Sequence, residues 1–210
     1  MPYVLRESVR GLEDELQAHP AITLQRMTVG LPLDKRQKEQ VKDVKPQSVF
    51  ALHQQLNELE IAWKPKDASD PNVLGAAHIL PVKDVLKDWP GVVYFDFTPP
   101  DARIRRFHPV DFFVDEACVG AFLNEPGRDD PAMYFYQFEG DPASLELNME
   151  GYVAMLLASK SFLYWQYAIL EIIQQHENPM SRRFKEWMPR LFARFDWQEY
   201  VELYSRLRLG

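Results

Sequence analysis

The side chains of this sequence that could bind a metal ion stand far apart. Zinc sites built from neighbouring residues need paired cysteines or histidines, because two ligands must share one face at about 2.0–2.3 Å from the ion. The five histidines occur singly, at His19, His53, His78, His108 and His176. His108 and Asp111, three residues apart, come closest to a pair, but two groups do not make a site. We therefore predict surface or hydrogen-bonded core histidines and no metal.

Nucleophiles and phosphate-binding loops are equally unsupported. The nine glycines form neither the Gly-Lys-Ser/Thr ending of a phosphate loop nor a dinucleotide fingerprint, and no serine lies within Gly-x-Ser-x-Gly. A reactive cysteine needs a nearby base or cation. Cys118 instead follows Asp115 and Glu116, which predicts a small buried strand residue. Carboxylates are too abundant to single out an acid–base pair. The sequence favours a protein without cofactor or enzymatic activity.

Acidic residues are concentrated in one part of the chain. Residues 111–150 contain ten acidic residues and one basic residue, Arg128, and so carry −9, whereas the whole chain carries −7. Such a face can simply aid solubility, or it can meet a basic partner. Nuclease toxins are partners of this kind, because an active site that binds nucleic acid must be cationic. Aromatic residues alternate with these carboxylates, and we expect some in the core and others as interface anchors.

The net charge also bears on ligands and location. A charge of −7 opposes binding to the phosphate backbone of nucleic acid. The apolar stretch Gly151–Leu170 carries Lys160 at its middle, which would cost about 2.5–3.5 kcal/mol in a bilayer, so we predict a buried helix and no membrane span. One cysteine excludes an intramolecular disulfide, and Met1–Val4 lacks a signal-peptide layout. We expect a cytoplasmic protein.

Hydrophobic periodicity predicts a sheet between helical segments. Apolar residues spaced three and four apart indicate helices over residues 5–18, 46–59, 82–89 and 148–175, and two more beyond residue 178. Aromatic-rich segments between turn residues indicate strands over residues 73–80, 92–97, 103–113, 118–123 and 133–138. Strands joined by short turns pair antiparallel. The predicted fold is therefore α+β, with a mainly antiparallel sheet flanked by helices and extra C-terminal helices.

Four segments of the chain share features with one known family. They are Val49–Leu59 with Asn57 and then Trp63, Gly75–Trp89 with its Ile-Leu-Pro, Arg106–Asp111 followed by Gly120 and Leu123, and Leu147–Leu157 with Tyr152 and Leu156. This pattern resembles the SUKH superfamily, which groups yeast cell-wall-synthesis regulators, the bacterial Syd protein and immunity proteins of polymorphic toxin systems. The resemblance covers about residues 46–170, and we expect one domain over residues 1–178 with an N-terminal helical extension. A C-terminal helical extension, residues 179–210, would pack on the same domain.

The resemblance implies a protein-binding function without catalytic residues. We expect an immunity protein that neutralises a cognate bacterial toxin, such as a basic nuclease-like domain, by occluding its active site. The residues predicted to contact the partner are Asp111, Asp115, Glu116, Glu125, Asp129, Asp130, Glu139, Asp141 and Trp63. Two alternatives stay open. One is a regulatory scaffold or chaperone-like adaptor of the same fold, and the other is an enzyme whose site assembles only in space.

Overall fold

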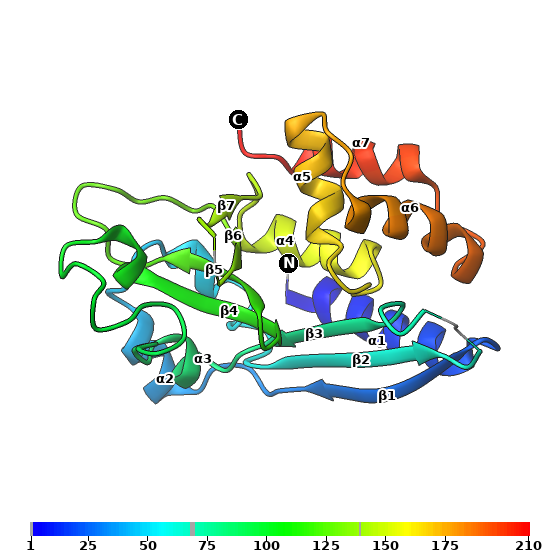
Figure 1. The fold of residues 1–210 in the computed structure, drawn as a ribbon. Coiled ribbons are helices and arrows are strands. Elements are labelled where there is room, and N and C mark those ends of the chain that lie inside the picture. The colour runs from blue at the N-terminus through cyan, green and yellow to red at the C-terminus, as the bar shows by residue number, and fades with distance from the viewer. Residues whose placement is uncertain (1, 68–69, 139) are drawn as a thin grey trace.

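One antiparallel sheet of seven strands organises the protein (Figure 1). The computed structural model describes residues 2–67, 70–138 and 140–210. The strands follow one another across the sheet in chain order. They are β1 (Ile22–Val29), β2 (Leu59–Pro65), β3 (Gly75–Ile79), β4 (Phe107–Val114), β5 (Ala117–Phe122), β6 (Tyr134–Gln137) and β7 (Ala143–Ser144). Every neighbouring pair is antiparallel, which confirms the predicted α+β fold.

Five helices form a layer on one side of the sheet (Figure 1). They are α1 (Pro2–Ala18), α4 (Met149–Ala158), α5 (Gln166–Gln174), α6 (Pro179–Leu191) and α7 (Trp197–Leu207). Helix α1 packs on β1, and α6 and α7 pack on α5 and α4. Polar side chains at Asn148, Asn178 and Asp196 accept hydrogen bonds from the first turns of α4, α6 and α7 and so fix where these helices begin. The predicted helix over residues 5–18 and the two predicted beyond residue 178 are confirmed.

The predicted helix over residues 46–59 is wrong. Only Gln47–Phe50 form a short 3₁₀ helix, turns follow, and β2 already begins at Leu59. The helical spacing reflects burial in these turns, since all of its earlier positions lie in the core, namely Val49, Leu52 and Leu56. The Asn57 side chain accepts a hydrogen bond from the Val82 N–H at 2.9 Å, which fastens the turns to the segment after β3.

Strands β1 and β2 and the short helix α2 (Lys35–Val41) were not predicted, although β2 alternates the buried residues Leu59, Ile61 and Trp63 with less buried ones, as a strand does. Strand β1 is an edge strand whose residues are mostly exposed, so it lacks a clear alternation of apolar and polar residues. Helix α2 carries few apolar residues but has a capping box, in which Asp34 and Gln37 each bind the other's backbone N–H. A local polar signal therefore marks α2, and the alternation in β2 is a strand signal that the helix predicted up to residue 59 obscured.

The predicted continuous helix over residues 148–175 is also wrong, because the chain breaks between α4 and α5. Lys160, Ser161 and Tyr164 have positive φ angles, which an α-helix does not allow. The break is fastened to the sheet by a hydrogen bond of 2.7 Å from the Trp63 indole Nε1 to the Lys160 carbonyl. Trp63 also explains Gly75, since a Cβ there would lie 1.9 Å from its Nε1. This contact joins β2 and β3 to the C-terminal helices.

The two faces of β4–β6 are covered differently. On one face, Phe113 and Phe135 pack on Tyr164 and Tyr167, which belong to the α4–α5 connection and α5. On the other face lies the chain between α3 (Val82–Val85) and β4, most of it without regular structure. Trp89 stacks on Phe112 of β4 with ring centroids 5.4 Å apart. Residues 86–106 thus cover this face of the sheet, as helices cover the other.

Several predicted elements change in length or type in this part of the chain. The predicted strand over residues 92–97 is wrong, since these residues form turns and no ladder. The helix predicted over residues 82–89 is only the single turn of α3, and β4 begins at Phe107 after a 3₁₀ turn. The predicted strands over residues 73–80, 118–123 and 133–138 are confirmed as β3, β5 and β6.

The apolar stretch at residues 151–170 lies in the core. It forms most of α4, the break and the start of α5, and Tyr152, Leu156, Phe162 and Trp165 are buried there. Within the described parts of the chain, no helix is long and apolar enough to cross a membrane.

Candidate functional site

Two of the nine residues predicted to contact a partner lie in the protein interior. Asp111 is 1% exposed and Trp63 is 0% exposed. The Asp111 carboxylate accepts hydrogen bonds from the Tyr152 hydroxyl at 2.5 Å and from the His78 backbone N–H at 2.7 Å. Neither Asp111 nor Trp63 reaches the surface, so the structure offers neither side chain to a partner.

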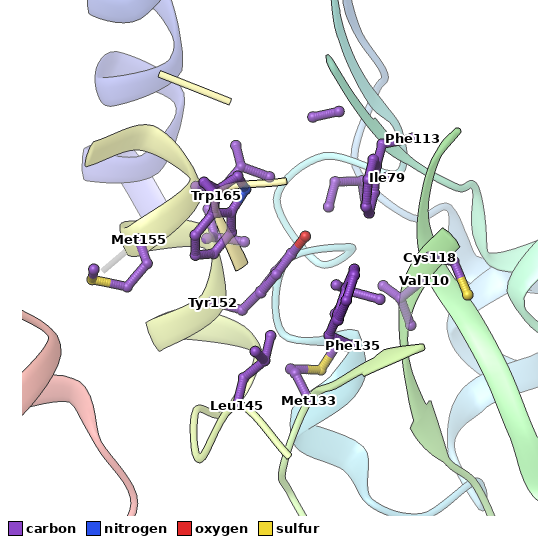
Figure 2. Close-up of a cluster of buried hydrophobic side chains, with 14 of the residues drawn as sticks. Ile79, Val110, Phe113, Cys118, Met133, Phe135, Leu145, Tyr152, Met155 and Trp165 are labelled. Carbon is purple, nitrogen blue, oxygen red and sulfur yellow. The ribbon is translucent and has the colours of Figure 1, made fainter. Parts of the chain in front are cut away.

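The surroundings of Asp111 hold its carboxylate in a dry core. Figure 2 shows Tyr152 reaching from α4 with its hydroxyl directed toward the strands. Burial raises the pKa of Asp111 to about 6, against the opposing effect of the hydrogen bonds from Tyr152 and His78. Burial and the nearby Asp111 also raise the pKa of the Cys118 thiol, which lies on β5 and is fully buried, as predicted. A thiol kept neutral in this way is a poor nucleophile.

The candidate metal ligands do not converge. Among the residues with described positions, no three His, Cys, Asp or Glu side chains lie close enough to hold an ion. The His108 Nδ1 donates to the Val85 carbonyl at 2.8 Å, whereas Asp111 faces Tyr152, so these two do not form the pair their spacing suggests.

Two more of the predicted residues bind an arginine of the same chain. Glu125 accepts two hydrogen bonds from the Arg103 guanidinium, at 2.7 and 2.8 Å, and its side chain is 7% exposed. Asp130 lies 3.5 Å from the same guanidinium and accepts a hydrogen bond from Tyr134. The bidentate pair holds the pKa of Glu125 below its usual range and raises that of Arg103. The guanidinium also lies over the Phe122 ring, 3.7 Å from its centroid. The Arg103 charge is thus compensated within the chain, and the two carboxylates leave the cluster with a net charge of −1.

Three predicted carboxylates are exposed and unpaired. Asp115, Asp129 and Asp141 lie in the loops that follow β4, β5 and β6, and they make no hydrogen bond or ion pair with any residue that the structure describes. Glu116 is exposed too, but its carboxylate accepts a hydrogen bond from the Tyr164 hydroxyl. Glu139 lies outside the described residues. Of the predicted acidic set, Asp115, Asp129 and Asp141 are thus the ones ready to meet a cation.

Near Asp141, two phenylalanines lie on the surface. Phe97 is 85% exposed and Phe95 is 42% exposed. Their rings stack on each other, with centroids 5.4 Å apart and planes inclined by 5°. Asp96 lies between them in the sequence and is exposed, as is Asp101 shortly after. Exposed paired rings beside free carboxylates are unusual on a surface that contacts only water.

The loop that carries these rings is held in place by hydrogen bonds. The Arg105 guanidinium donates to the carbonyl oxygens of Thr98 at 2.6 Å, Pro99 at 2.9 Å and Phe95 at 3.4 Å. The Thr98 hydroxyl accepts from the Phe95 N–H at 3.0 Å, and the Thr98 N–H donates to the Phe95 carbonyl at 2.9 Å. The exposure of Phe95 and Phe97 therefore belongs to an ordered loop.

A groove of about 550 Å³ separates this loop from the connection between β6 and β7. Its apolar walls are Val93, Phe95, Phe97, Ile104, Phe122 and Phe138, and its charged residues are Arg103 and Asp141. A second hollow, beside Asp115 and Glu116, shares Phe138 and Gly140 with the groove, so the two are continuous. We define the acidic–aromatic surface as Phe95, Phe97 and Asp141 at the groove, Asp115 at the second hollow, and the exposed residues Asp96, Asp101 and Asp129 of the adjoining loops.

Four residues of this surface were not predicted from the sequence, namely Phe95, Asp96, Phe97 and Asp101. Their alternation of aromatic and acidic residues is typical of a half-buried strand, and it was interpreted in that way. The residues that flank this segment carry a signal that could have identified it as an exposed loop. Pro90-Gly91 precedes the segment and Pro99-Pro100 follows it, so proline interrupts the chain on both sides and favours a loop.

Comparisons with protein-family models, with curated proteins and with solved structures give no match to this chain. The resemblance to the SUKH superfamily therefore stays a prediction.

Proposed function

We propose that this protein binds another protein through the acidic–aromatic surface, and that the partner is a basic bacterial toxin domain whose active site it covers. The observation that carries the proposal is the set of exposed, unpaired carboxylates at Asp115, Asp129 and Asp141 beside the exposed rings of Phe95 and Phe97. The resemblance to immunity proteins of the SUKH superfamily supports the same conclusion.

The charges favour a cationic partner. Arg103 is neutralised by Glu125 and Asp130, and the Arg105 guanidinium is occupied by loop carbonyls. Arg106 donates to the Asn124 carbonyl, and Arg128 is exposed. Eight acidic residues lie in the same region, Asp96, Asp101, Asp115, Glu116, Glu125, Asp129, Asp130 and Asp141, so the negative charge exceeds the positive.

A toxin that cuts nucleic acid offers the complement of such a surface. Its active site must attract phosphates, and carboxylates can occupy the positions that phosphates would take. Complementary charge raises the association rate and makes it depend on salt, while aromatic contacts slow dissociation. Covering the cationic cleft would block the toxin without any chemical change in either protein.

Charge reversal tests the proposal. The protein is expressed with the product of the adjoining reading frame, and association is followed by surface plasmon resonance at several salt concentrations. We expect a complex, rescue of growth, and an association rate that falls by about tenfold or more when Asp115, Asp129 and Asp141 are all changed to Lys. The matched control changes Glu7, Asp14 and Glu202 to Lys, since these exposed residues of α1 and α7 carry the same charge elsewhere.

The two parts of the proposal have separate contradicting outcomes. Equal association rates for the two triple variants would show that the partner binds another surface. A neighbouring product that neither binds this protein nor is neutralised by it would contradict the immunity function.

A further inference from the structure

We propose that the groove between the loop of Phe95 and Phe97 and the β6–β7 connection is the anchor site for the partner, and that it takes an apolar side chain next to a lysine or arginine. This inference rests on the proposed function for the class of its occupant, a segment of a basic protein. It adds which groove the segment enters and which side chains it must carry.

The loop geometry supports an anchor site because it is fixed before anything binds. Three loop carbonyls share the Arg105 guanidinium, and Phe95 and Thr98 exchange two further hydrogen bonds. The same guanidinium lies 4.6 Å from the centroid of the Tyr94 ring. A partner therefore does not have to order this loop, and less conformational entropy is lost on association. Exposed rings held in this way have the character of interface hot spots.

The groove walls indicate what enters. Phe122 at the end of β5 and Phe138 just after β6 line the groove together with the stacked rings of the loop, so the interior suits an aliphatic or aromatic side chain. Arg103 belongs to the wall, but its charge is met by Glu125 and its face is covered by Phe122. An anion would have to compete with Glu125 for this guanidinium, which argues against a phosphate or carboxylate ligand.

Asp141 indicates the charge of the neighbouring group. It lies at the groove with no hydrogen bond or ion pair to any described residue. A lysine or arginine adjacent to the buried side chain would place its cation there. Asp115 lies in the hollow continuous with the groove. Asp129 precedes Asp130, which lies 3.5 Å from the groove residue Arg103, so a segment with several basic residues gains more than a single small cation. Anionic lipid and nucleic acid are repelled by the same charges.

The test uses the folded protein labelled with 4-fluorophenylalanine and observed by ¹⁹F NMR. The signals of Phe95 and Phe97 are assigned with Phe95→Leu and Phe97→Leu. The probes are two synthetic peptides, one of alternating lysine and leucine and one of alternating glutamate and leucine. We expect the two assigned signals to shift with the lysine peptide and not with the glutamate peptide.

Variants locate the binding within the groove. Phe97→Ala and Asp141→Asn are each expected to weaken binding of the lysine peptide by about tenfold or more, as measured by calorimetry. The matched control is Leu31→Ala, which removes a residue 79% exposed at the far end of β1 and should leave binding unchanged. Unshifted Phe95 and Phe97 signals, equal shifts with both peptides, or equal losses in all three variants would each overturn the anchor site.

The outcome is separable from that of the proposed function. Lysine-peptide binding in the groove together with a neighbouring product that does not bind would uphold the anchor site and contradict the immunity function. A toxin complex with unchanged affinity after Phe97→Ala would do the reverse.

Discussion

The two faces of β4–β6 carry the same kinds of side chain in opposite settings. On the helix-covered face, the carboxylate of Asp111 and the ring of Phe135 are buried and fully engaged with α4 and α5. On the loop-covered face, the carboxylate of Asp141 and the ring of Phe97 remain exposed. Helices cover the first face with apolar side chains at regular spacing, whereas the irregular chain over the second leaves rings and charges at its rim. The covering element therefore decides which side chains are left for a partner.

The largest expected effect is on stability, and it distinguishes a buried ring on the helix-covered side from an exposed ring on the loop-covered side. Phe135→Ala should lower the free energy of unfolding by about 3–5 kcal/mol, because it removes a buried ring that packs on Tyr167 and Phe113. Phe97→Ala should change it by less than about 0.5 kcal/mol. Urea unfolding of the two variants measures both values. Comparable losses would mean that Phe97 is part of the fold, and the distinction between the faces would fail.

The next effect concerns the buried carboxylate. The pKa of Asp111 is raised from 3.8 to about 6 in the folded chain, so folding favours its protonated form. Its contribution to stability is therefore greatest below about pH 4 and is lost as the pH rises through 6, by about 3 kcal/mol in total. Asp111→Asn removes this dependence.

Unfolding at about pH 4 and pH 7 measures this effect as a difference. The free energy of unfolding of the wild type minus that of Asp111→Asn should fall by about 2–2.5 kcal/mol from the lower pH to the higher, because a small part of the total is already lost at pH 4. The raised pKa values of Tyr152 and Cys118 keep both groups neutral over this range. A constant difference would show that Asp111 is not desolvated.

The smallest effect concerns the loop itself. Arg105→Gln removes the donors to the carbonyls of Phe95, Thr98 and Pro99, and we expect a loss of about 1 kcal/mol in global stability. The clearer readout is local, since the Phe95 and Thr98 N–H groups should exchange with solvent faster. Arg106→Gln is the matched control, because among the described residues that side chain hydrogen-bonds the Asn124 carbonyl and no part of the loop. Unchanged exchange at Phe95 and Thr98 would show that the loop is ordered by other contacts.

Much of the fold follows from local signals, and its failures have physical causes. The β3, β5 and β6 strands carry apolar residues between turn residues, and the C-terminal helices have an apolar face, so both are readable in the sequence. Residues 46–59 have helical spacing but form turns, because tertiary contacts bury the same residues without a helix. The break at Lys160 depends on Trp63, about a hundred residues earlier, and no local pattern could show it.

The site was predicted only in part, for a related reason. Charge content located the acidic region of the chain, and Asp115, Asp129 and Asp141 are exposed there. Charge content does not tell which carboxylates meet a partner within the chain, as Asp111 does with Tyr152 and Glu125 does with Arg103. These pairings join residues on different elements and exist only once the sheet has formed.

The unequal covering of the sheet has a consequence for how such a protein can change over time. Strand pairing and the close packing of Trp63 on Gly75 constrain the sheet, so mutations there lower the stability of the fold. Residues 90–102 have no ladder partner in a neighbouring strand, and loops of this kind tolerate substitution and insertion. The chain can thus acquire a new binding preference by drift in one short stretch while its scaffold is inherited intact.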